Sequence, residues 1–346
     1  MIKRIGFTGR WFNEDQTLKP KLLKEIEDPL RSRSTTLRWL NENKTLAEDR
    51  MFELFTHNVN MMKKQLIKVS ELPINRRMFR FSSRIIPMST EPNWGYFWRK
   101  SEIIDYMSKH FAEVGELSRK HNIKISFHPG QFCVLASENP NIVNRSIQEF
   151  EYHVNMARWM GFGKTFQDGC KINVHISGKQ GPQGIIDVLP RLSPEARNLI
   201  TIENDENKWG LDASLELKDH VALVLDIHHH WIRDEEYIQP DDERIKPIVE
   251  SWRGKRPTMH YSYSRDEWLA KANINNVHGQ LNDINTLLER NCVKQKLRAH
   301  SDYYPNKHAN DWALSFLNDF DIMCEAKKKN LANEQVYNRA VELKLL

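Results

Sequence analysis

The sequence has few cysteines and lacks any paired cysteine motif. Its four cysteines, Cys133, Cys170, Cys292 and Cys324, are widely separated along the 346 residues. Disulfide frameworks and thiolate zinc knuckles need closely spaced cysteines, so this spacing speaks against both. We therefore expect a protein of a reducing compartment and predict a cytoplasmic location.

Long hydrophobic runs are also missing. The apolar run 221–225 ends at Asp226, far short of the ~20 residues that a membrane helix needs. The first residues carry Lys3 and Arg4 and lack the apolar region of a signal peptide. We expect no membrane partner. Hydrophobic residues make up 40% of the chain and charged residues 28%, which excludes a disordered protein.

The excess of positive charge is small. Lysine and arginine number 51 and the acidic residues 46, giving a net charge of +5. This balance is compatible with a polyanionic partner, but a modest excess is equally typical of an ordinary solvated surface. Charge alone therefore leaves both interpretations open.

Eight short apolar or β-branched segments recur along the chain, and helical patterns lie between them. Short buried strands that alternate with helices predict parallel βα units, and eight units favour a closed barrel. We predict an α/β fold, a TIM (β/α)8 barrel with loop insertions and a C-terminal helical tail. The predicted strands are 2–7, 78–81, 123–128, 172–175, 199–203, 222–226, 258–260 and 322–325.

Apolar residues at three- and four-residue steps predict the helices. They cover 46–67, 102–121 and 144–160, with weaker patterns over 211–218, 241–252 and 284–291. Segments 10–33 and 91–100 do not fit the repeating unit and are predicted as loop insertions. No composition shift marks a linker, so we predict one domain over 1–346. Its barrel spans about 1–327, and a helical extension covers 328–346.

Imidazoles and carboxylates end most of the later predicted strands or follow them closely. All parallel strands of a barrel point their C-terminal ends at one mouth, so these side chains should converge there. Each alone is more often a hydrogen-bonded rim residue, and Asp226 could simply cap a helix. We expect at least one of His228, His229 and His230 to face solvent. The predicted ligand set is His128, His175, Glu203, Asp226, His229, His260, His300 and Glu325.

A cluster of metal ions is the interpretation that best explains this set. Several ionisable groups buried together without partners would be costly, and divalent cations remove that cost. Imidazole and carboxylate without thiolate suit Zn²⁺, Mn²⁺ or Fe²⁺. The set is too large for one tetrahedral ion, so we predict two or three ions with Glu203 as the bridge. Such clusters promote in-line displacement at phosphorus.

Two strings of the sequence are quite specific, His128-Pro129-Gly130-Gln131-Phe132 and Glu203-Asn204-Asp205-Glu206. With these strings the chain resembles the UV damage endonucleases, which are related to apurinic endonuclease IV. Further matching stretches are 79–87, 174–176, 226–230, 259–260, 299–300 and 325–327. The resemblance implies a monomeric DNA repair hydrolase that nicks damaged duplex DNA by attack of metal-activated water. The cut falls immediately 5′ of pyrimidine dimers, 6-4 photoproducts and, more weakly, abasic sites, leaving a 3′-hydroxyl and a 5′-phosphate.

The resemblance also implies roles for individual residues. His128, His175 and Glu203 would hold one ion, and Glu203, Asp226, His260 and Glu325 a second. His229 and His300 would help to hold a third. The ions would be Mn²⁺, Zn²⁺ or Mg²⁺. The residues to which the resemblance gives catalytic roles are Glu203, His128, His175 and Glu325.

A Gln-aromatic pair after the first histidine is the lesion probe of the family. Here it is Gln131-Phe132, and Phe7 is predicted to line the same surface. A wedge must offset the few kcal/mol of base unstacking, and aromatic stacking supplies roughly 1–3 kcal/mol per base. Weaker candidates for phosphate contacts are Arg80, Arg84, Lys179, Arg298 and Lys327.

Three positions depart from the family pattern. Phe132 replaces a tyrosine, Thr258 replaces a lysine two residues before His260, and Glu91 stands where a histidine is usual. The Thr258 change puts the third metal in question. Two other functions stay open at this point. One is a metal-dependent sugar isomerase or epimerase on the same barrel, and the other is a non-catalytic binding protein on a decayed enzyme scaffold.

Overall fold

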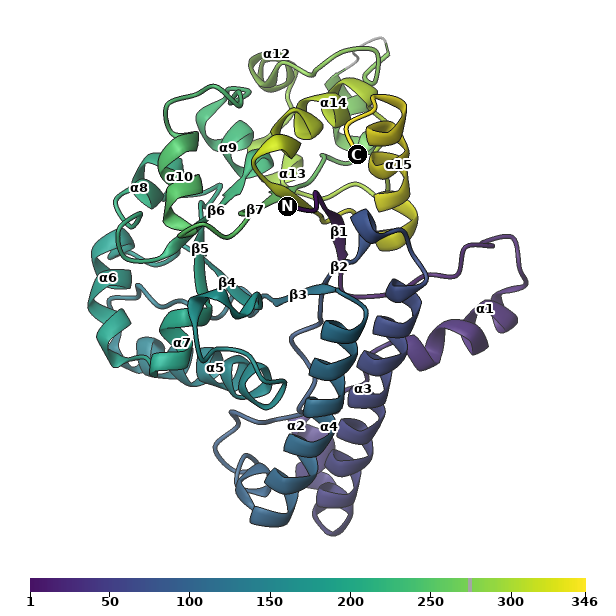
Figure 1. The fold of residues 1–346 in the computed structure, drawn as a ribbon, viewed down its shortest axis with the longest axis vertical. Helices are drawn as coiled ribbons and strands as arrows, with labels where there is room; N and C mark the ends of the chain where they lie inside the picture. The colour runs from purple at the N-terminus through teal and green to yellow at the C-terminus, as the bar shows by residue number, and fades with distance from the viewer. Residues whose placement is uncertain (273–275) are drawn as a thin grey trace.

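Eight parallel strands form a closed barrel in chain order, and β8 pairs with β1 (Figure 1). The computed structural model describes residues 1–272 and 276–346. The predicted TIM (β/α)8 barrel is confirmed. The strands are β1 Ile5–Thr8, β2 Met78–Arg80, β3 Lys124–Phe127, β4 Lys171–His175, β5 Ile200–Glu203, β6 Ala222–Asp226, β7 Thr258–Tyr261 and β8 Asp321–Cys324.

Helices surround the barrel, and α3 and α4 run side by side past its edge (Figure 1). Every predicted strand and helix overlaps an observed one. The helices in the described part of the chain are α1 Pro20–Glu27, α2 Leu37–Glu42, α3 Ala47–Ser70, α4 Ser101–Lys120, α5 Pro140–Trp159, α6 Gly181–Val188, α7 Pro194–Leu199, α8 Leu211–Leu215, α9 Ile227–Asp234, α10 Ile245–Ser251, α11 Asp266–Leu269, α12 Ile284–Glu289, α13 Lys294–Leu297, α14 Lys307–Ser315 and α15 Lys329–Glu342.

The segment 10–33 is not a plain loop, so that prediction is wrong in part. It contains α1, which projects from the barrel (Figure 1), and a short 3₁₀ turn, Asp28–Leu30. Two buried side-chain amides of α3 hold both ends of this segment by hydrogen bonds to its backbone. Gln65 donates to the carbonyls of Gly9 and Leu30, and Asn58 accepts from the Arg33 amide at 2.7 Å. Because these backbone groups are satisfied inside the fold, the insertion has a defined position.

Helix α15 follows β8 and packs on β1 and β8. Its buried Asn333 donates to the carbonyls of Ile5 and Gly6 at 3.0 and 3.1 Å. The guanidinium of Arg76 donates to the Oδ1 of Asn333 at 2.9 Å. The chain beyond residue 327 is therefore the outer helix of the eighth βα unit.

Side chains alternate along each strand, and this alternation places the polar residues. In β4, Ile172 and Val174 belong to the hydrophobic core. Asn173 lies on the other face, where its Oδ1 accepts from Thr201 of β5 at 3.0 Å. His175 shares that face because it is two residues further on. The interior of the barrel thus becomes polar toward the C-terminal ends of the strands.

Among residues 1–272 and 276–346, no helix combines the length and the apolar composition that crossing a membrane requires.

Candidate metal centre

Strand register sets site residues beside one another at the C-terminal mouth. His175 of β4 is level with Glu203 of β5, and Asp226 of β6 is level with His260 of β7. Neighbouring strands lie about 4.8 Å apart, so level side chains on the same face are in contact range. Residues far apart in sequence therefore meet at one point.

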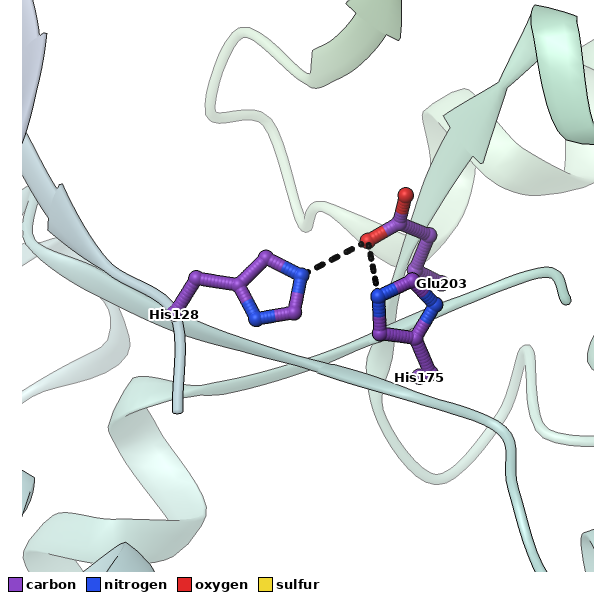
Figure 2. Close-up of side chains that lie close together, drawn as sticks. All are labelled: His128, His175 and Glu203. Atoms are coloured by element: carbon purple, nitrogen blue, oxygen red, sulfur yellow. Dashed lines mark hydrogen bonds and ion pairs between the residues drawn. The ribbon is translucent and has the colours of Figure 1, made fainter. Parts of the chain in front are cut away.

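Glu203 is the centre of this group. Its Oε1 is 2.8 Å from His260 Nδ1 and 3.5 Å from His229 Nδ1. Its Oε2 is 3.3 Å from His128 Nε2 and 4.0 Å from His175 Nε2. Figure 2 shows the rings of His128 and His175 directed at the same carboxylate oxygen. Both oxygens of one buried carboxylate thus face imidazoles, as a bridging ligand requires.

Three sets of donor atoms among the described residues are close enough to surround an ion. They are His128, His175 and Glu203; Glu203, Asp226 and His260; and His175, Glu206 and His229. The first two agree with the ligand sets that the resemblance implies, apart from Glu325. In the third, His229 is grouped with Glu206 and His175 instead of His300.

Hydrogen bonds at the Nδ1 atoms of two histidines leave their Nε2 atoms available as metal ligands. The Nδ1 of His128 lies 2.9 Å from the carbonyl of Pro129, and that of His229 lies 2.9 Å from the carbonyl of Asn204. A carbonyl at Nδ1 fixes the N–H there and leaves the lone pair on Nε2, the usual arrangement of metal-binding histidines.

Asp226 uses only one of its carboxylate oxygens. Its Oδ1 accepts from the amides of His228 and His229 at 2.8 Å each and so caps α9. Its Oδ2 is buried without a hydrogen-bond partner. Buried polar atoms are rarely left unpaired, and an unpaired carboxylate oxygen between imidazoles fits a cation. The residues present therefore suit divalent ions.

The charges of the cluster are unbalanced. Burial raises the pKa of Asp226 to about 7, and the neighbouring Glu203 and Glu325 add to the rise. Burial would lower the pKa of His229, but Asp226, Glu203 and Glu206 raise it to about 10. Burial would raise the pKa of Glu203, yet the imidazoles of His260 and His175 hold it well below its usual value. The raised pKa values of Asp226 and His229 both mean that the cluster favours the binding of a proton, and Glu203 stays negative beside the imidazoles. The cluster therefore attracts positive charge.

Glu325 and His300 lie at one side of this cluster. Glu325 Oε1 is 2.6 Å from Arg80 Nη1 and 3.4 Å from His260 Nδ1. His300 Nδ1 lies 3.9 Å from Glu325 Oε2, and its Nε2 is 3.3 Å from the hydroxyl of Ser262. Of the eight predicted ligands, these two belong to none of the three donor sets in the described chain.

The expectation that one residue of the His228–His230 run faces solvent is wrong. All three are buried, with at most 7% of their surface exposed. His228 Nε2 is 3.1 Å from the hydroxyl of Ser264. His230 lies 2.9 Å from both Asp234 and Glu236. The run forms the start of α9, which packs against β7 and α13, and each imidazole has a polar partner.

Two further residues of the site were missed from the sequence. Asn173 donates to Glu203 Oε2, and Glu206 Oε2 lies 3.6 Å from His229 Nε2. Asn173 carries a signal, because it is polar within an apolar strand and two residues before His175. Glu206 ends the Glu-Asn-Asp-Glu string. Its Oε1 pairs with Arg298 Nε at 2.6 Å, so this arginine is engaged by a carboxylate.

Gln131 and Phe132 are exposed just beyond His128, and Phe132 has 84% of its surface in solvent. Phe7 is a correction. It is fully buried, with ring centroids 5.3 Å from Phe79 and 5.9 Å from Trp11. It lies on the face of β1 that joins the hydrophobic core, so it cannot contact DNA.

The predicted phosphate-contacting residues differ in their exposure to solvent. Arg80 is mostly buried beside Glu325, while Arg84 and Lys327 are exposed. Lys329, which sequence reasoning missed, is near Arg80, and its Nζ lies 3.1 Å from the hydroxyl of Thr8. Burial lowers the pKa of Lys329 to about 8, with repulsion from Arg80 contributing.

The remaining two departures from the family pattern are Thr258 and Glu91. Thr258 lies in a strand of the barrel, and Glu91 lies at the start of a turn. Thr258 opens β7 and is 9% exposed. The carboxylate of Glu91 accepts from the amides of Asn93 and Trp94 at 2.8 and 2.7 Å. Glu91 therefore stabilises its own turn.

Known proteins that are similar to this chain show its family. A family model described as UV-endonuclease UvdE matches residues 19–344, and the chain belongs to this family. A UV DNA damage endonuclease of Bacillus cereus (strain G9842) is 26% identical over 301 residues, covering 84% of this chain and 83% of that protein. One of Bacillus mycoides (strain KBAB4) is 24% identical over 314 residues, covering 86% and 85%.

Solved structures agree on the fold. The crystal structure of SacUVDE has a TM-score of 0.72 at 21% identity and covers 99% of this chain and 100% of its own. Endonuclease IV from Thermus thermophilus has a TM-score of 0.51 at 11% identity, covering 82% and 95%. The resemblance seen in the sequence is thus confirmed, and family membership supports the DNA repair endonuclease over the sugar isomerase.

Proposed function

We propose that this protein nicks duplex DNA immediately 5′ of UV photolesions in a reaction that depends on two or three divalent metal ions. The observation that carries the proposal is the convergence of three donor sets on Glu203, in a chain of the UvdE family. The products would be a 3′-hydroxyl and a 5′-phosphate. We propose that the enzyme acts as a monomer in the compartment that holds the DNA.

His128, His175 and Glu203 would hold one ion, and Glu203, Asp226 and His260 a second. A third would lie between His175, His229 and Glu206. Bound ions would supply Lewis-acid charge and lower the pKa of a water molecule. Glu203 suits the shared position, because the surrounding imidazoles keep it ionised and both of its oxygens face the cluster.

The residues around the ligands have their own tasks. Asn173 and the Pro129 and Asn204 carbonyls orient Glu203, His128 and His229. Fixed ligands keep the geometry that the reaction needs, and loss of such outer contacts typically costs 10–100-fold in activity. Arg80 and Lys329 form a cationic side of the cluster beside Glu325. This side suits the phosphates next to the scissile bond.

The exposed pair Gln131 and Phe132 would read the lesion. A free aromatic ring next to the first metal ligand can fill the gap that opens when damaged bases leave the helix. Stacking does not require a hydroxyl, so phenylalanine can replace the tyrosine of the family in this role. UV lesions are already poorly stacked, which lowers the energy needed to open the duplex at that point.

A nicking assay tests the proposal. The substrate is a duplex with one thymine dimer, labelled at the 5′ end of the damaged strand, beside the same duplex without damage. Protein treated with EDTA should leave both intact, and added Mn²⁺ should restore one cut directly 5′ of the dimer. Extension of the cut strand by a polymerase would report the 3′-hydroxyl. A cut elsewhere, or no cut with any divalent ion, would contradict the proposal.

A further inference from the structure

A second charged cavity lies at the opposite end of the barrel. Lys124, Lys171 and Asp321 are the first residues of β3, β4 and β8, and Arg4 directly precedes β1. They surround a cavity of about 420 Å³ at the N-terminal ends of the strands, far along the barrel from Glu203. We call it the N-terminal cavity. Its cationic lining residues are Arg4, Arg119, Lys124, Lys171, Lys255 and Arg256.

The two carboxylates that line this cavity are already occupied. Asp321 accepts from the Arg4 amide at 2.9 Å, from Lys124 Nζ at 2.9 Å and from Arg256 Nε at 2.8 Å. Asp168 accepts from the amide and the hydroxyl of Thr165 and closes its own turn. The carboxylate of Asp321 thus balances the positive charges of Lys124 and Arg256. Neither carboxylate is available to pair with the other cationic residues of the lining.

Lys171, Lys255 and Arg119 form the unbalanced part. In residues 1–272 and 276–346, no carboxylate lies within 4.0 Å of their charged nitrogens. Lys171 is 5% exposed. Its Nζ donates to the carbonyls of Phe166 and Asn198 and lies 3.5 Å from the centroid of the Phe166 ring. Burial lowers its pKa to about 7, and repulsion from Arg253 and Lys255 adds to this.

Lys255 lies beside the loop that enters β4, and Arg119 lines the same cavity. Lys255 Nζ lies 3.9 Å from the point that a Cβ on Gly169 would occupy. Arg119 uses Nη1 for the Met160 carbonyl at 2.7 Å, which leaves other guanidinium donors for a ligand. The ammonium of Lys171 is held by its two carbonyls and the Phe166 ring, so it contributes positive charge to the lining while Lys255 and Arg119 supply the donors. A small anion with several acceptor oxygens would pair with the donors of Lys255 and Arg119 and would balance the charge of Lys171.

We propose that the N-terminal cavity binds a phosphate group. Tetrahedral oxyanions with two negative charges match ammonium and guanidinium donors that line one cavity, and a cavity of about 420 Å³ is large enough for a phosphate that carries a nucleoside. The ligand is inorganic phosphate or a mononucleotide, and both share this chemistry. The inference does not depend on the proposed nuclease function, because the cavity is at the other mouth of the barrel.

Calorimetric titration of the full chain tests this site, with inorganic phosphate and thymidine 5′-monophosphate as separate probes at constant ionic strength. We expect saturable binding of at least one probe. Lys255→Ala should weaken it at least about fivefold. Lys164→Ala is the matched control, because it removes one exposed lysine outside the cavity lining and should bind as the wild type does. The tighter probe identifies the source of the phosphate.

Nicking activity and the thermal midpoint serve as checks that Lys255→Ala is folded, and both should match the wild type. If that variant does not fold, Lys255→Gln replaces it with the same expectation. Three results would overturn the proposal: no saturable binding of either probe, unchanged binding in the folded Lys255 variant, or equal weakening in Lys164→Ala.

Discussion

Glu203 has an imidazole against each carboxylate oxygen, His260 on Oε1 and His128 on Oε2. Glu203→Gln removes the charge but keeps the shape. We expect nicking of a photodimer duplex to fall at least about a hundredfold, because metal ligands act through that charge. Affinity for the duplex, followed by fluorescence anisotropy, should change little. Equal loss of binding and nicking would contradict the central role, and Glu216→Gln, at an exposed carboxylate, is the control.

Phe132 is free to enter DNA because 84% of its surface is exposed. Phe132→Ala should weaken binding to photodimer duplex about 5- to 150-fold, the equivalent of roughly 1–3 kcal/mol of stacking. Binding to undamaged duplex should change far less, since no base has to be replaced there. Phe132→Tyr keeps the ring and should restore the preference. If both duplexes lose affinity alike, Phe132 is not a wedge.

Some site residues could be predicted and others could not, for physical reasons. His128, His175, Glu203, Asp226 and His260 follow from the rule that parallel strands end at one mouth. Glu206 and Lys329 lie in loops and on a helix beyond the strands, where no periodicity shows which side chains return to the centre. Phe7 was misplaced because the chain sequence does not give which face of β1 meets the helices.

The strands were predictable as elements because each is a short apolar segment followed by a polar end. Helix α1 was missed, since it has eight residues and part of its apolar side is in solvent, with Leu22 44% and Ile26 39% exposed. Helix α9 was missed because its three histidines interrupt the apolar pattern. The partners of His228 and His229 are Ser264 and Asn204, which lie far away in sequence, so the local sequence cannot reveal the burial of these two imidazoles.

At the scale of elements, α15 is attached to the barrel through Asn333. Asn333→Ala removes the acceptor of Arg76 Nε and the side-chain donor to two strand carbonyls in a buried place. We expect the free energy of unfolding to fall by about 2–4 kcal/mol. Urea denaturation followed by circular dichroism measures this change. Asn338→Ala, at an exposed position of the same helix, should change it by under about 0.5 kcal/mol.

At the scale of the whole molecule, His153 makes stability depend on pH. It is fully buried in α5, and burial lowers its pKa to about 4. Its neighbours include Glu149, whose carbonyl lies 2.8 Å from Nδ1, and His128. Between the folded pKa and the unfolded value near 6.5, the unfolded chain binds more protons. Stability is therefore lost as pH falls through this window.

His153→Asn removes this titration. The loss of unfolding free energy between pH 6.5 and pH 4 should shrink by roughly 3 kcal/mol relative to the wild type. Chemical denaturation at a series of pH values measures it, and the difference between the two proteins cancels groups that they share. Parallel pH curves for the two proteins would show that His153 does not titrate in this range.

The pairing of β1 with β8 has a consequence for how the enzyme is made. β1 is synthesised before the other strands of the barrel and has to wait for β8 before the barrel can close, and contacts so distant in sequence form slowly. Glu325 comes directly after that final strand. The barrel that positions the metal-centre residues is therefore completed only after β8 and Glu325 have been synthesised.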